Sequence, residues 1–225
     1  MTITMGISME WIGSSRIILS IIRLYFYACV SLFVGFVLPL LFEPLKMISS
    51  SILNVLVANE LSFGLNALAY GIVVATLFTF AWNFLLGAGL QIISGLFGSE
   101  IPKVMLVGRA ALIGFIYGGS LESIARALNY NAVSYVGLTI VLFTEFLAYS
   151  IATYGGTNVG KVLVTPGNFT TSQKIVNVLK GPPLSLYRKM KNDLKTELRA
   201  SLKLCPIIAV LLLFAASLEI WLVLG

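Results

Sequence analysis

Long apolar runs recur along this chain, and they restrict its fold more than any other feature. The five longest begin at Ile17, Asn66, Val104, Val133 and Leu204. Each reaches the roughly 20 residues that an α-helix needs to cross a lipid bilayer, and none shows the short alternating segments of a membrane β-barrel. The pattern therefore predicts an all-α fold, a polytopic transmembrane helical bundle with about five spans.

Composition supports this class and narrows the chemistry. Hydrophobic residues make up 58% of the 225 residues and charged residues 11%, and the mean hydropathy of +0.97 is far above that of an ordinary soluble domain. The absence of histidine excludes His-based metal sites and Ser-His catalytic triads. No phosphate loop, metal cluster or nucleophile elbow is visible in the sequence. We therefore expect a protein that is not an enzyme and that uses no metal or cofactor.

The runs are interpreted as one integral membrane domain over residues 1–225. Its spans are placed at about 17–42, 66–97, 104–128, 133–155 and 204–224. The second is long for one crossing, so it either breaks near Asn83 or runs on as a tilted helix, and whether residues 62–97 form one span or two stays open. Residues 47–59 are too short to cross, which favours an interfacial or re-entrant helix.

Basic residues predict the orientation. Nine of the 15 Lys and Arg residues fall between the fourth and fifth spans, and loops rich in these residues stay in the cytoplasm. With five spans, the N-terminus is then cytoplasmic and the C-terminus outside, in a multi-pass protein of the cell membrane. The nine are Lys161, Lys174, Lys180, Arg188, Lys189, Lys191, Lys195, Arg199 and Lys203.

The predicted cytoplasmic segment, residues 156–203, has two parts. Residues 156–181 are rich in turn-forming residues and are expected to be irregular. Leu184–Leu204 has a leucine or methionine at every fourth position among basic residues, which predicts a basic amphipathic helix. This helix either lies on the bundle base as a support or docks a partner, and anionic lipid or a protein partner is expected there. The positive charge is ascribed to orientation and lipid contact, with no nucleic acid as a partner, and a homo-oligomer is left open.

Three acidic residues lie inside the predicted spans. Glu122 is near the outer end of the third span and can reach the interface or pair with Arg126. Glu145 is central in the fourth span and Glu219 lies in the outer half of the fifth, and neither has a basic residue within a helical turn. An acid at such a depth is expected to face the protein interior, another span or water. Arg109 is close enough to the cytoplasmic boundary to snorkel, and its pairing with a glutamate on another helix is left open.

Glu145 has two candidate polar neighbours. Tyr149 follows four residues later on the same helix face, and Asn83 of the second span can bond across helices. Because removal from water disfavours the ionised carboxyl, Glu145 is expected to be protonated or hydrogen-bonded. Two interpretations remain open: the acids hold helices together, or they carry protons or cations.

Small residues predict where helices approach closely. They recur at every fourth position along and just past the fourth span and along the third, a spacing typical of close helix contacts in membranes. The residues are Ala148, Ala152, Gly156, Gly160, Gly114 and Gly118.

Three segments carry a resemblance to a known family: NFLLGAGL (83–90), TEFLAYSIATYGGTNVG (144–160) and LLLFAASLEIWL (211–222). In this order they resemble the stage II sporulation protein M family, and the resemblance covers roughly residues 66–225. Many members have Pro-His-Gly just before the acidic residue of the second segment, where this chain has Ile-Val-Leu at 140–142. The resemblance assigns Glu145 and Glu219 as the family's two intramembrane acids.

The resemblance implies a non-enzymatic component of a membrane complex, acting as a scaffold or assembly subunit. The alternative is a small transporter or channel subunit that uses Glu145 and Glu219 to bind protons or cations. These hypotheses differ in whether a neutral glutamine at position 145 preserves function.

Overall fold

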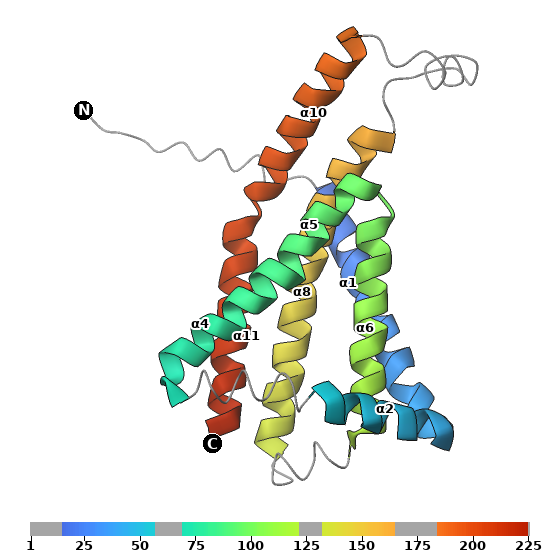
Figure 1. Cartoon of the computed structure of the whole chain (residues 1–225), viewed down its shortest axis with the longest axis vertical. Helices are drawn as coiled ribbons and strands as arrows, with labels where there is room; N and C mark the ends of the chain where they lie inside the picture. The colour runs from blue at the N-terminus through green and yellow to red at the C-terminus, as the bar shows by residue number, and fades with distance from the viewer. Residues whose placement is uncertain (1–14, 57–68, 122–131, 165–183, 225) are drawn as a thin grey trace.

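The computed structural model describes residues 15–56, 69–121, 132–164 and 184–224. Over these ranges the chain is helical without a strand, and five helices are long and apolar enough to cross a membrane, which confirms the predicted fold class (Figure 1). The helices are α1 (Ser15–Leu41), α2 (Glu43–Leu56), α4 (Ile72–Trp82), η3 (Asn83–Gly89), α5 (Leu90–Ser94), η4 (Gly95–Phe97), α6 (Ile101–Gly119), α8 (Ala132–Val164), α10 (Leu184–Leu202) and α11 (Cys205–Leu224).

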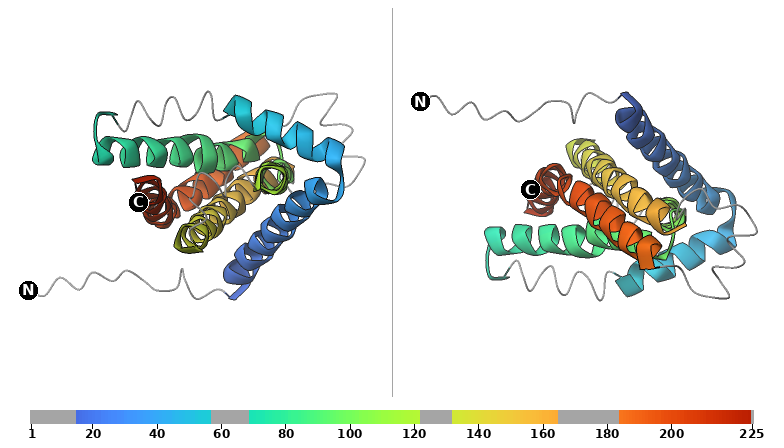
Figure 2. Two further views of the ribbon diagram at one scale, coloured as in Figure 1. Left: turned by 90° about the horizontal axis from the view of Figure 1, so that it is seen from below. Right: turned by 90° about the horizontal axis from the view of Figure 1, so that it is seen from above.

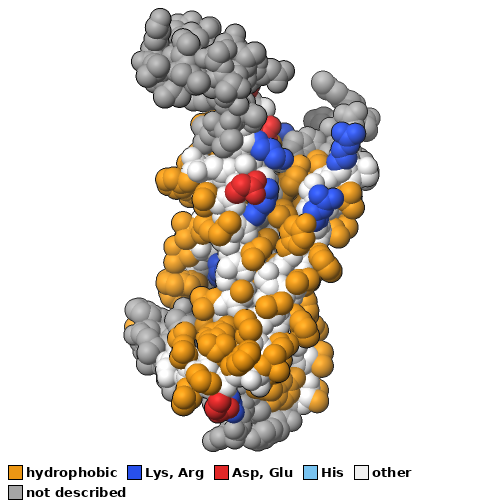
Figure 3. Space-filling model, turned by 90° about the vertical axis from the view of Figure 1, so that its right-hand side faces the viewer, with side chains coloured by type: hydrophobic (Ala, Val, Ile, Leu, Met, Phe, Trp, Pro, Cys, Tyr) orange, Lys and Arg blue, Asp and Glu red, His pale blue; other side chains and the backbone are white. Residues whose placement is uncertain are grey.

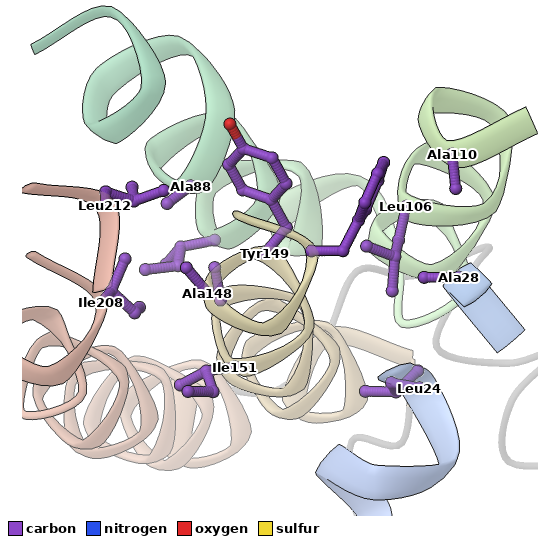
Figure 4. Packing of buried hydrophobic residues seen from close by; sticks show 13 residues of the cluster. Leu24, Ala28, Ala88, Leu106, Ala110, Ala148, Tyr149, Ile151, Ile208 and Leu212 are labelled. Atoms are coloured by element: carbon purple, nitrogen blue, oxygen red, sulfur yellow. The ribbon is translucent and has the colours of Figure 1, made fainter. Parts of the chain in front are cut away.

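Helix α8 is the centre of the bundle. It packs against α1, α5, α6, α10 and α11, and views from either end of the bundle place it between α1 and the helix that contains α4 and α5 (Figure 2). Ala148 and Ala152 are fully buried on it. Around them pack apolar side chains of the neighbouring helices, including Leu24 of α1, Leu106 of α6 and Leu212 of α11 (Figure 4).

Helices α1 and α6 cross at glycines. Gly114 and Gly118 of α6 lie so close to α1 that a Cβ on either would overlap the carbonyl oxygen of Leu32 or Phe36, respectively. Dispersion attraction between closely approaching backbones drives helix association in lipid, where apolar burial alone offers little. The two glycines therefore set the spacing of this pair.

The second span is one continuous helix. It runs from Ile72 to Phe97 through α4, the π-helix η3, α5 and a final 3₁₀ turn. It begins after Gly71, whose φ of 109° suits glycine, and Asn66 lies outside the described residues. No break occurs at Asn83, where α4 passes into the wider π turn. Insertions of this kind are frequent at functional sites.

Helix α8 corrects the predicted end of the fourth span. Instead of ending at Gly155, it continues to Val164, so the start of the segment expected to be irregular is helical. The sequence rule treated the glycines there as turn signals. A Cβ on Gly156 would overlap the Gln91 carbonyl oxygen, and one on Gly160 would crowd the Ser99 backbone. These glycines therefore serve close packing and not chain reversal.

Helix α2 lies across the end of α6 (Figure 1). Ser49 is fully buried, and its hydroxyl donates to the carbonyl oxygens of Phe115 at 2.8 Å and Ile116 at 3.2 Å. These bonds attach α2 to the last turn of α6, where the Ile116 carbonyl also accepts from the Ser120 N–H at 3.1 Å. The segment predicted as a short interfacial or re-entrant helix is thus fixed to the bundle, and residues 57–59 lie outside the description.

Helices α10 and α11 follow one another almost in line (Figure 1). A turn at residues 203–204 separates them, and Pro206 stands in the first turn of α11, where its missing N–H costs nothing. The Ser201 hydroxyl donates to the Gly155 carbonyl of α8 at 3.1 Å. Beyond that contact α10 extends past the bundle, and it does not lie flat over the base as the support interpretation expected.

The third span also differs from prediction. It begins at Ile101 and its helix ends at Gly119, while residues 122–131, which include Glu122 and Arg126, lie outside the description. At its start the Lys103 ammonium donates to Glu100 at 2.7 Å, and this hydrogen bond holds the pKa of the Glu100 carboxyl below its usual value.

The outer surface of the bundle is largely apolar, as expected for a protein surrounded by lipid. Large apolar side chains face outward along the spans, among them Phe33 of α1, Val73 of α4 and Val210 of α11, which are 67%, 70% and 69% exposed. They form a hydrophobic belt, and the Lys and Arg side chains in the same view gather mostly toward one end (Figure 3). A water-soluble protein rarely exposes so much apolar surface. The protein is a multi-pass membrane protein.

Candidate functional site

Four polar side chains from three spans meet in the middle of the bundle. Asn83 comes from η3, Arg109 from α6, and Glu145 and Tyr149 from α8. Glu145 and Tyr149 are four residues apart, so they lie on one face of α8. Arg109 is near the midpoint of its 19-residue helix. We call these four residues the mid-bundle network.

Hydrogen bonds join the network into a chain. The Asn83 amide Nδ2 donates to Glu145 Oε1 at 2.6 Å, and the Tyr149 hydroxyl donates to Asn83 Oδ1 at 3.0 Å. Arg109 Nη2 donates to the Tyr149 hydroxyl at 3.2 Å, and its guanidinium carbon is 4.2 Å from the centre of the tyrosine ring. Bonds to an ionised group are the stronger kind, and a cation over an aromatic face adds attraction.

Three of the four side chains of the network are buried. Glu145 and Asn83 are each 8% exposed and Tyr149 is fully buried. The Tyr149 ring packs edge-on against Phe146, with ring centres 6.0 Å apart. On the opposite side it fills the space over Gly87, where a Cβ would overlap the ring. Glycine at position 87 therefore lets the π turn approach α8 closely enough for Asn83 to reach Glu145.

Glu219 occupies a different position. It lies on α11, is half-buried, and interacts electrostatically with Glu145 and with Tyr117 of α6. The second predicted acid is therefore close enough to Glu145 to affect it electrostatically.

Arg109 was wrongly expected to snorkel. Its side chain instead stacks on Tyr149 and enters the network. Length alone suggested that the guanidinium could reach the interface, whereas the aromatic ring and hydroxyl offer it a partner at its own depth. The sequence does not show that α6 and α8 are neighbours, so the pairing of Arg109 with Tyr149 could not be predicted from it.

A second polar link was missed altogether. Thr153 of α8 donates to Gln91 Oε1 at 3.2 Å, and Gln91 is 1% exposed. A signal was present, because Thr153 continues the every-fourth-residue series of Glu145 and Tyr149, and Gln91 lies eight residues after Asn83. Two facing polar series therefore join the second span to α8.

The small residues singled out earlier lie at two interfaces. Gly114 and Gly118 face α1, and Gly156 and Gly160 face α5, η4 and the chain that follows. Ala148 and Ala152 lie in the apolar centre beside Tyr149. The polar network is thus framed by close helix contacts, which hold its members in place.

The chemistry available to this arrangement is mainly hydrogen bonding between helices. Over the described ranges, no three His, Cys, Asp or Glu side chains gather as a metal site. A groove of about 500 Å³ opens between α4 and α11, lined by apolar residues such as Leu77 and Trp221, and Glu145 does not line it. The carboxyl of Glu145 is therefore engaged by protein and not presented to this groove.

The chain matches none of the protein-family models, curated proteins or solved structures with which it was compared. Its resemblance to the stage II sporulation protein M family accordingly stays an expectation from the sequence. The features that bear on function are the five-span bundle and the mid-bundle network.

Proposed function

We propose that this protein is a non-enzymatic scaffold or assembly subunit of a membrane complex, as its resemblance to the stage II sporulation protein M family implies. The observation that carries the proposal is the hydrogen bond from Asn83 to the buried Glu145 carboxyl. It gives the acid a partner on another span, so Glu145 needs no transported ion to explain its place in the membrane. A rigid bundle is what an assembly platform requires.

The location and orientation belong to the same proposal. The protein lies in the cell membrane with its N-terminus in the cytoplasm and its C-terminus outside. Two observations support this: α1 begins, and α8 ends, at the end of the bundle from which α10 extends, and the exposed Lys191, Lys195 and Arg199 lie on α10. Basic residues are retained on the cytoplasmic side.

Helix α10 is the proposed contact with partners outside the bilayer. It extends past the bundle, and basic side chains cover the face beside Leu198 and Leu202, which are 39% and 54% exposed. Such a surface suits an acidic protein partner or anionic lipid headgroups. Both partners are compatible with a scaffold that joins a membrane complex to its cytoplasmic side.

The alternative is a small transporter or channel subunit. The observation in its favour is the electrostatic interaction between Glu145 and Glu219 inside the bundle, because paired acids are a common means of binding protons or cations. This role requires the carboxyl of Glu145 to gain and lose an ion. An amide at the same position cannot do so.

The test compares assembly with flux in the same variants. The tagged protein is purified from its native membrane, and its co-purifying partners are compared for the unmodified chain, Glu145→Gln and Glu145→Leu. Liposomes with each protein are assayed for pH-dependent proton or cation flux. If the protein is a scaffold, Glu145→Gln keeps its co-purifying partner and the liposomes show no flux. If the liposomes show pH-dependent flux that Glu145→Gln abolishes, the scaffold proposal is wrong and the transporter proposal is supported.

A further inference from the structure

Arg109 is a cation at the centre of a span with most of its hydrogen-bonding capacity unused. It is the ninth of the 19 residues of α6, so it lies about 12 Å from the start of the helix and about 15 Å from its end at 1.5 Å per residue. A guanidinium has five N–H groups. Within the described part of the chain, its one hydrogen bond goes to the Tyr149 hydroxyl, and neither described ion pair includes it.

Arg109 is only half-buried, so its side chain reaches from the Tyr149 ring to the outer surface of the bundle. Cations at this depth are costly, and they are usually paired with an acid or a carbonyl. Glu145 acts on Arg109 electrostatically, but the hydrogen bonds between them run through Asn83 and Tyr149, and no described ion pair joins the two groups.

The surface beside Arg109 has the spacing of a helix-packing seam. Ile101, Met105, Gly108 and Leu112 are exposed on α6, and their spacing of four, three and four residues is that of the contact positions in left-handed helix pairs. A Cβ on Gly108 would meet nothing within 4 Å, so another helix can come close there. Arg109 lies at the edge of this seam, next to Met105 on the helical wheel.

We propose that this seam docks a transmembrane helix of another protein that carries a carboxylate near its middle, paired with Arg109. The inference rests on the proposed scaffold role and names its partner within the bilayer. The guanidinium fork matches a carboxylate with two parallel hydrogen bonds. The small Gly108 gives the partner backbone room to approach.

Other occupants fit the charge less well. Lipid phosphates lie beyond the helix ends, which are about 12 Å and about 15 Å from Arg109 along α6. A second copy that docked its own seam symmetrically would bring two guanidinium groups together. A carboxylate on a partner helix is the group that can bond the unused N–H groups of Arg109 at this depth.

The test uses a synthetic leucine-rich transmembrane peptide with one central glutamate, and a matched peptide with leucine there. Energy transfer is measured in liposomes between the labelled chain and each peptide. The glutamate peptide is expected to associate about tenfold more strongly than the leucine peptide, as suits a charged hydrogen bond. Arg109→Met should remove this preference and Arg23→Met, at an exposed arginine of α1, should keep it.

A second variant guards against misfolding of Arg109→Met. Gly108→Leu fills the open space without touching the network and should also abolish association of the glutamate peptide, while the thermal stability of the bundle stays unchanged. Equal association of the two peptides, persistence in Arg109→Met, or energy transfer between copies of the chain across this seam would overturn the inference. The scaffold proposal would survive such a result if the native partner still co-purified.

Discussion

At the scale of single residues, the central feature is a carboxyl group held by an amide. The bond from Asn83 to Glu145 is buried between spans. In hydrocarbon the alternative to such a bond is an unsatisfied polar group, although measured hydrogen bonds between membrane helices average only about 0.6 kcal/mol. The network matters because three bonds and one ring contact share the same four side chains.

Substitution of Glu145 separates its charge from its hydrogen bonding. Glu145→Gln keeps a carbonyl oxygen for the Asn83 amide, so we expect little loss of stability. Glu145→Leu leaves the buried amide unpaired and should cost about 1–3 kcal/mol. Thermal unfolding in one detergent compares the two. Equal melting temperatures for both variants would show that the Asn83 bond contributes nothing.

Gly87 provides an independent test of how the network is positioned. A Cβ there would overlap the Tyr149 ring, so Gly87→Val should push η3 away from α8 and destabilise the bundle by about 1–3 kcal/mol. The matched control is Gly87→Val combined with Tyr149→Ala, which removes the ring. We expect Tyr149→Ala to lower the free energy of unfolding less in the Gly87→Val background than in the unmodified chain. Equal losses in both backgrounds would argue against contact between Gly87 and the Tyr149 ring.

At the scale of helices, glycines decide where elements approach and where they end. The sequence correctly predicted helices for the five apolar runs, because length and hydropathy determine membrane spans almost without tertiary context. It misplaced the end of α8, because the same Gly155 and Gly156 that often end helices here pack against α10 and α5. Only the position of the neighbouring helix distinguishes these two uses of glycine.

In the candidate site too, positions along one helix could be predicted, whereas contacts between helices could not. The spacing of Glu145 and Tyr149 placed both on one face, and the depth of Asn83 made it a candidate partner. The part played by Arg109 could not be predicted, since it depends on α6 lying beside the Tyr149 face of α8. Helical periodicity shows which residues share a face of one helix, but it does not show which other span packs against that face.

Two glycines of α6 give a matched comparison of packing. Gly114 faces the Leu32 carbonyl, whereas the space over Gly108 is open. Gly114→Ala should force α1 and α6 apart and cost about 1–3 kcal/mol, while Gly108→Ala should be neutral or stabilise slightly through lower backbone entropy. Unfolding in bicelles measures both. Equal losses at the two positions would refute the proposed α1–α6 crossing.

At the scale of the whole molecule, the two ends of the bundle differ. One end carries the basic helix α10, and the other carries α2, which is fixed to α6 by Ser49. The proposed five-span arrangement places the two chain ends on opposite sides of the membrane. The proposed orientation makes α10 cytoplasmic and α2 external.

Single-cysteine labelling checks this orientation. In a background with Cys29 and Cys205 replaced by alanine, Lys195→Cys on α10 and Lys46→Cys on α2 introduce exposed thiols. A membrane-impermeant maleimide added to intact cells should label Lys46→Cys only, and cell lysis should expose Lys195→Cys. The reverse pattern would invert the topology, and labelling of both would contradict the five-span arrangement.

The account depends on Glu145 acting as a structural partner of Asn83, and a double-mutant cycle measures that partnership most directly. The free energy of unfolding in bicelles is determined for the unmodified chain, Asn83→Leu, Glu145→Leu and the double variant. We predict a coupling free energy of about 0.5–2 kcal/mol, with the double variant less destabilised than the two single losses combined. Losses that simply add would contradict the account.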